Sequence, residues 1–205
     1  MIEKIESQYE TAEQQKGAAL LGMWIFIGTE ILFFGGLFLS YTYYRVRYPQ
    51  VLEQVGPQFN VALGTINTAI LLTSSYFMAM AIHSIENARQ RAATRYLAAT
   101  VGLGLIFLAF KAREYIEDST TLIASGPDER VMRLFFWLYY VMTGLHALHV
   151  TIGVGVISWI LRRTVRGDFS SAYSTPMEVT GLYWHFVDVV WIFLYPLLYL
   201  IGRHS

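Results

Sequence analysis

The stretch that decides the fold reads Trp184-His185-Phe186-Val187-Asp188-Val189-Val190-Trp191-Ile192-Phe193-Leu194-Tyr195. It predicts a hydrophobic helix long enough to cross a bilayer, yet it contains an imidazole and a carboxylate. His185 and Asp188 are three residues apart, so on a helix they share one face, one turn from each other. A lone charge at membrane depth costs roughly 3 kcal/mol or more. We therefore expect this face to contact protein rather than lipid.

The composition indicates a membrane protein. Of the 205 residues, 55% are hydrophobic and 15% are charged, against about 25% charged residues in an average soluble domain. The formal net charge is zero, so nothing predicts a nucleic-acid partner. The chain has no cysteine, which excludes disulfides, thiolate metal sites, iron–sulfur clusters and covalent haem attachment within it.

Hydrophobic segments recur along the chain, each close to the about 20 residues that a spanning helix needs. They cover about 18–43, 59–85, 96–116, 131–161 and 177–201. The sequence therefore predicts an all-α integral membrane bundle of five transmembrane helices, preceded by a polar N-terminal segment at 1–17. That segment is acidic, unlike the start of a cleavable signal, so we expect the first helix to be retained. A small excess of basic residues favours an N-terminus inside the cell.

Glu30 lies about midway along the first predicted helix. A carboxyl at that depth is either protonated or paired. It is a functional candidate by default, as a group that handles protons or contacts lipid. A protonated side chain that hydrogen-bonds a neighbouring helix is the other interpretation, and the sequence leaves both open.

Polar side chains also mark the last two predicted helices. His146 and His149 are three residues apart and could ligate a metal or haem, or join a polar network between helices. We favour the network, because a few membrane histidines without cysteine make a poor general metal site. Glu178, His185 and Asp188 fall within a quarter turn on the last helix, which predicts one buried polar stripe.

Two charged pairs end the third predicted helix. Lys111 and Glu114 have i,i+3 spacing, and Arg113 and Glu117 have i,i+4 spacing. Such pairs are typical of a helix surface. We therefore expect both to be ordinary ion pairs at the membrane interface.

Several motifs together resemble one family. They are Thr29-Glu-Ile-Leu-Phe-Phe, Leu63-Gly-Thr-Ile-Asn-Thr, Lys111-Ala-Arg-Glu-Tyr, Thr143-Gly-Leu-His-Ala-Leu-His-Val and Tyr183-Trp-His-Phe-Val-Asp-Val-Val-Trp-Ile-Phe-Leu-Tyr. In this order, over residues 18–202, they resemble subunit III of haem–copper oxidases, in the five-helix bacterial form of cytochrome c oxidase subunit 3.

The resemblance implies a non-catalytic subunit of an aerobic respiratory complex that reduces oxygen and translocates protons. Such a subunit packs on the catalytic haem–copper subunit I, with subunit II in the same complex, and organises phospholipids in a cleft. Haem and copper would lie in those partners, and this chain would hold no metal, cofactor or active site. Glu30 would lie near the lipid cleft and support durable proton uptake. The resemblance implies interhelical contacts for Glu114, His146, His149, Glu178, His185 and Asp188.

It also implies a multi-pass protein of the bacterial inner membrane with a cytoplasmic N-terminus, and it allows a supercomplex with a cytochrome c-reducing complex. Related alternatives are subunit III of a quinol oxidase and the subunit-III-like accessory protein of nitric oxide reductase. Two alternatives come from other classes. One is a haem-bearing membrane anchor with two of His146, His149 and His185 as axial ligands. The other is a proton-coupled transporter built on Glu30 and Asp188, which the lack of a detectable inverted repeat disfavours.

Overall fold

The structure is a computed structural model that describes residues 7–51, 60–121, 129–170 and 173–200, except for the side chains of 118–121. Five of its helices are long and apolar enough to cross a membrane. They are α1 (Ala12–Arg47), α3 (Val61–Glu86), α4 (Gln90–Thr121), α5 (Glu129–Arg166) and α6 (Thr175–Tyr195), which continues as the π-helix η2 (Pro196–Leu200). Among the described residues, β-structure is limited to one isolated bridge, Ser170 to Tyr173. The all-α prediction is confirmed.

Three of the helices are longer than the hydrophobic segments that predicted them. α1, α4 and α5 run past their predicted bounds at both ends, and α1 begins at Ala12, inside the segment predicted as a polar tail. Hydropathy detects the apolar stretch, whereas the hydrogen-bonded helix continues through polar residues until a cap stops it. At the start of α1 the Thr11 hydroxyl oxygen accepts the N–H of Gln14 at 3.1 Å, as an N-cap does. The predicted limits at 59 and 201 lie outside the described residues.

α3 and α5 end in the same type of cap, in which one residue takes a left-handed backbone. After α5 this residue is Gly167, with φ of 84°, and after α3 it is Ala88, with φ of 55°. In both caps its N–H and the next N–H return to carbonyls of the last helical turn, which is the Schellman arrangement. The cap on α3 turns the chain straight into α4, so these two helices pack as neighbours along their length.

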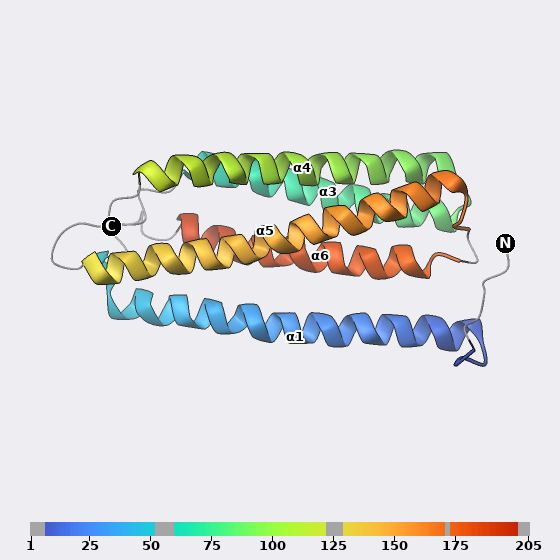
Figure 1. The fold of residues 1–205 in the computed structure, drawn as a ribbon, viewed down its shortest axis with the longest axis horizontal. Helices are drawn as coiled ribbons and strands as arrows, with labels where there is room; N and C mark the ends of the chain where they lie inside the picture. The colour runs from blue at the N-terminus through green and yellow to red at the C-terminus, as the bar shows by residue number, and fades with distance from the viewer. Residues whose placement is uncertain (1–6, 52–59, 122–128, 171–172, 201–205) are drawn as a thin grey trace.

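α6 occupies the centre of the bundle. It packs against α1, α3 and α5, while α4 packs on α3 and α5. Figure 1 shows α1 and α4 on opposite sides of the α5–α6 pair. α6 is the most buried of the five spans and α1 the least. Trp184 and Trp191 of α6 are fully buried, so the stretch that predicted a protein-facing helix forms the core.

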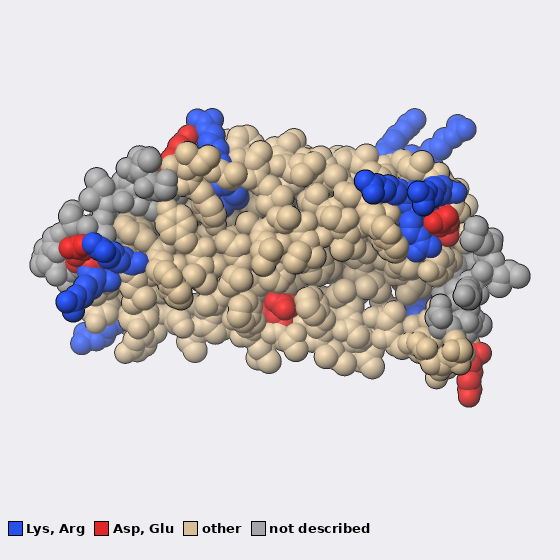
Figure 2. Space-filling model, in the orientation of Figure 1, with Lys and Arg blue, Asp and Glu red and all other residues tan. Residues whose placement is uncertain are grey.

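The surface matches a membrane protein. Figure 2 shows charged side chains gathered toward the two ends of the bundle and, between them, a band of uncharged residues in which an acidic group is visible. Large apolar side chains such as Leu32, Leu39 and Trp24 are well exposed along α1. In water such a surface would be unfavourable, but in a bilayer it faces hydrocarbon. The chain is therefore a multi-pass membrane protein.

Candidate functional site

Glu30 lies against His149, about midway along α1 and α5 respectively. The carboxylate Oε2 and the imidazole Nε2 are 3.2 Å apart, within ion-pair distance but not aligned for a hydrogen bond. His149 Nδ1 donates to the carbonyl of Leu145 at 2.8 Å, which leaves Nε2 as the nitrogen that faces Glu30. Tyr183 donates its hydroxyl proton to the His149 carbonyl at 3.0 Å. Three helices therefore position this pair.

The chemistry of the pair follows from this tautomer. With Nδ1–H held by a backbone carbonyl, a proton shared by the two side chains has two places, the Glu30 carboxyl and His149 Nε2. The first state is a neutral pair and the second an ion pair. The side chains are 18% and 13% exposed, so the pair lies at the edge of the protein rather than in its core.

Two apolar grooves border the pair along α1. One, of about 300 Å³, has Met23 and Phe26 on one wall and Ile152 and Tyr183 among the residues facing them. Glu30 follows Phe26 by one turn, and His149 precedes Ile152 by about one turn, so this groove leads to the pair. The other, of about 270 Å³, lies between α1 and α6. Its lining residues are Ile31, Phe34, Gly35, Phe38, Phe186, Val189, Val190 and Phe193.

The predicted polar stripe on α6 divides between different neighbours. Glu178, in the first turn, forms an ion pair with Lys16 of α1 at 2.8 Å. His185 Nδ1 lies 2.6 Å from the Ser75 hydroxyl of α3. Asp188 is 3% exposed, and its carboxylate lies next to the same Ser75 hydroxyl. The three side chains share one face of α6, of which only Asp188 is buried, and because α6 is central this face meets α1 at its start and α3 further along.

His146 is separate from His149, although both are on α5. Its ring lies edge-on to Phe107 and 5.1 Å from the Trp191 ring, measured between centroids. It is 1% exposed, and neither ring nitrogen has a hydrogen-bond partner among the described residues. Those residues also contain no group of three or more His, Cys, Asp or Glu side chains that could hold a metal ion.

The pair Lys111–Glu114 of α4 is buried, so the expectation of an interfacial ion pair is wrong for it. Both side chains are 2% exposed, with Nζ 2.8 Å from Glu114 Oε2. Lys111 also donates to the Tyr199 hydroxyl at 2.8 Å, and its ammonium lies over the rings of Tyr115, Tyr139, Trp191 and Tyr199 at 5.2–5.5 Å. Arg113–Glu117, in contrast, is the predicted exposed pair at 2.7 Å.

Comparison with known proteins assigns the family. The model of the family described as Cytochrome c oxidase subunit III matches residues 3–203. The chain belongs to the cytochrome c oxidase subunit III family. Cytochrome c oxidase subunit 3 of Thermostichus vulcanus is 33% identical over 193 residues, covering 94% of this chain and 92% of that protein. Cytochrome c oxidase subunit 3 of Cyprinus carpio is 35% identical over 197 residues, and that of Danio rerio is 36% identical over 200 residues. Each of these two alignments covers 93% of this chain and 72% of the relative.

Membership in the subunit III family confirms the resemblance that the motifs gave, and it assigns the chain to an oxidase complex. Of the motif residues, Glu30 and His149 face each other, and Glu114 and His185 have the interhelical partners described above. Sequence reasoning missed the partners Lys16, Ser75, Tyr139 and Tyr199, because serine, lysine and tyrosine are common at helix surfaces and membrane interfaces. One signal for a buried cluster was available in the sequence: Lys111 carries a charge close to an apolar segment, where a charge needs a partner.

Proposed function

We propose that this chain is a non-catalytic subunit III that packs on a catalytic haem–copper subunit and prolongs its activity during turnover. The Glu30–His149 pair carries the proposal. It is a proton-sharing group in the membrane-spanning part, at the edge of the protein and next to apolar grooves. Such a group supports proton supply to a partner and contact with lipid headgroups or tails, but it has no redox chemistry of its own.

The histidines do not fit a haem anchor. His149 uses Nδ1 for the Leu145 carbonyl and faces Glu30 with Nε2, and His185 uses Nδ1 for Ser75. His146 packs against the rings of Phe107 and Trp191, which also contact each other. A haem needs axial nitrogens that point into a shared space, which supports placing haem and copper in the partner subunits I and II.

The apolar grooves along α1 support a role in organising phospholipids. α1 is the least buried span, and both grooves have apolar walls that end near Glu30. A lipid chain in a groove excludes water from the pair and so controls when its proton exchanges. We further propose a bacterial inner-membrane location with the N-terminus in the cytoplasm, consistent with the small excess of basic residues on that side.

Glu30→Gln in the assembled oxidase tests the proposal. The amide keeps the size of the side chain but cannot take up or release the proton. We expect an initial oxygen-reduction rate close to that of the native complex and a several-fold shorter lifetime of activity under continuous turnover. His149→Gln is expected to act in the same direction, because it removes the other proton-sharing group.

The matched control is Glu129→Gln. Glu129 pairs with Arg133 at the start of α5, so this variant makes the same Glu→Gln change without touching the grooves. A Glu30→Gln complex that is fully assembled but inactive from its first turnover would overturn the proposal. So would one whose activity lasts as long as that of Glu129→Gln.

A further inference from the structure

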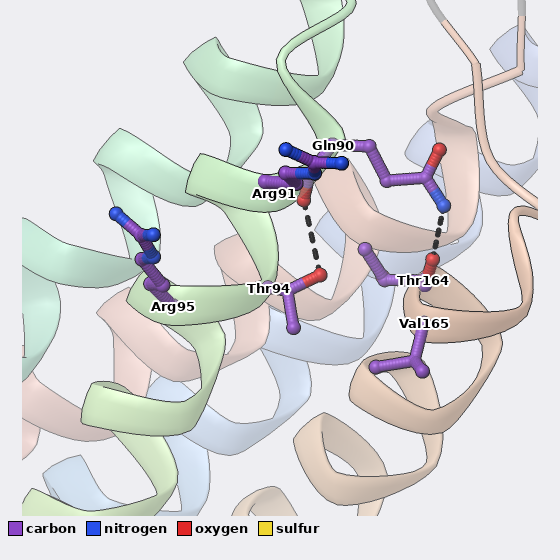
Figure 3. A pocket seen from close by; sticks show the side chains of 6 residues that line it. All are labelled: Gln90, Arg91, Thr94, Arg95, Thr164 and Val165. Atoms are coloured by element: carbon purple, nitrogen blue, oxygen red, sulfur yellow. Dashed lines mark hydrogen bonds between the residues drawn. The ribbon is translucent and has the colours of Figure 1, made fainter.

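A separate cavity of about 520 Å³ opens between the start of α4 and the end of α5, on the side of the bundle away from α1. Its lining residues are Gln90, Arg91, Thr94, Arg95, Thr164 and Val165. Figure 3 shows the Gln90 amide reaching across to the Thr164 carbonyl, which closes one side, and Thr94 bonded back to Gln90. Arg91 and Arg95, the other polar residues of the cavity, take no part in this closure.

The charge in this cavity is not balanced by acidic neighbours. Arg91 and Arg95 stand one turn apart on α4 (Figure 3) and are exposed, and no described acidic side chain pairs with either. Glu86 and Asp168, which flank this end of α3 and α5, have other partners. The start of α4 adds the positive end of its helix dipole. The two arginines and the helix dipole together favour an anion with several acceptor oxygens over a cation at this cavity.

An apolar stripe continues from the arginines toward the middle of the bundle. Ala98, Gly102 and Leu105 follow Arg95 on the same face of α4 at helical spacing. Ala98 and Leu105 are exposed, and a Cβ added at Gly102 would meet nothing within 4 Å. At 1.5 Å per residue, Arg95 to Leu105 spans about 15 Å, which is half of the about 30 Å hydrocarbon core.

We propose that this cavity binds the phosphate of an anionic phospholipid, with its acyl chain along Ala98, Gly102 and Leu105. The phosphate lies between the guanidiniums of Arg91 and Arg95, at the level of the helix ends. The length of the stripe, which matches one leaflet, favours a lipid phosphate over a free one. Basic pockets between transmembrane helices are a known type of anionic-lipid site.

This inference requires only that the chain spans a membrane. The cavity lies between α4 and α5, whereas the grooves that carry the proposal for Glu30 border α1. The loss of one site therefore leaves the other intact, and their tests are independent.

The test uses the assembled complex in nanodiscs of phosphatidylcholine with a minority of phosphatidylglycerol. In one set the phosphatidylglycerol carries a diazirine on its acyl chain, and in a second set the phosphatidylcholine carries it. After illumination, crosslinks to residues 94–109 are measured by mass spectrometry. In the native complex we expect a strong preference for the anionic probe. In the Arg91→Gln/Arg95→Gln variant this preference should fall by up to roughly 30-fold, because each basic side chain adds to the attraction for anionic lipid at the membrane surface.

The matched control is Arg162→Gln/Arg166→Gln. These arginines have the same i,i+4 spacing at the same end of α5 and are exposed, but they do not line the cavity. We expect the preference to persist in this variant, and crosslinks of phosphatidylcholine to α1 to be unchanged in both. No preference in the native complex, or an equal loss in both variants, would overturn the proposal. Abolition of the preference by inorganic phosphate, but not by sodium chloride of equal ionic strength, would identify a free-phosphate site instead of a lipid site.

Discussion

Lys111→Met would remove a cation from a fully enclosed polar cluster and leave Glu114 behind. Breaking a buried ion pair by removing one partner costs about 3–5 kcal/mol. Here Glu114 Oε1 still accepts from Tyr199 at 2.6 Å and Tyr139 at 3.2 Å, so its carboxyl keeps two donors. We therefore expect a loss at the lower end, about 3 kcal/mol of unfolding free energy.

The absence of cysteine from the chain provides an assay. A single cysteine at Ala81, which is fully buried in α3, reacts with a thiol reagent only when the bundle opens. Because 1.4 kcal/mol is a factor of ten in an equilibrium constant, Lys111→Met should raise the labelling rate by about a hundredfold in the complex. Labelling of this chain is followed by mass spectrometry.

Two variants make the result specific. Arg113→Met removes the exposed cation of the neighbouring pair and should leave the labelling rate unchanged. Lys111→Met/Glu114→Leu removes both buried charges and should recover part of the loss, because an apolar pair has no uncompensated charge. A labelling rate for Lys111→Met equal to that of the native chain would refute a desolvated charge pair at this position.

The other predictions concern backbone positions, and both are measured by the same labelling assay. Gly153→Ala places a Cβ 2.7 Å from the Trp184 ring and should destabilise the bundle by about 1–3 kcal/mol. The control Gly155→Ala places a Cβ with nothing within 4 Å and should be neutral or slightly stabilising. Equal effects of the two variants would contradict the close approach of α5 and α6. Gly167 and Ala88 both have positive φ, which glycine adopts more readily than alanine. Gly167→Ala should therefore destabilise the bundle by about 1 kcal/mol, and Ala88→Gly should stabilise it by about 1 kcal/mol. Effects of the same sign would be inconsistent with these caps.

The helices and their order could be predicted from the sequence, because apolar segments of spanning length are a local property. The depth of Glu30 and the shared face of Glu178, His185 and Asp188 also follow from helical spacing alone. Their partners do not. Glu30 meets His149 because α1 packs on α5, and nothing local in the sequence specifies that packing.

The error at Lys111 has a physical reason. An i,i+3 ion pair in sequence looks the same whether it faces water or protein, and burial depends on what covers it. Here η2 brings Tyr199 over the pair, and α5 brings Tyr139. The spacing that predicted the pair carries no information about these partners, so the sequence favoured an exposed pair.

The account as a whole is tested most directly by purifying the complex through a tag on this chain, then separating the chain and recording reduced-minus-oxidised spectra of both fractions. We expect a large haem–copper subunit to co-purify, with all haem bands in its fraction and none in this chain. A Soret band that stays with the isolated chain and shifts on reduction would contradict a non-catalytic subunit. Purification without any haem–copper partner would contradict its assignment to the oxidase.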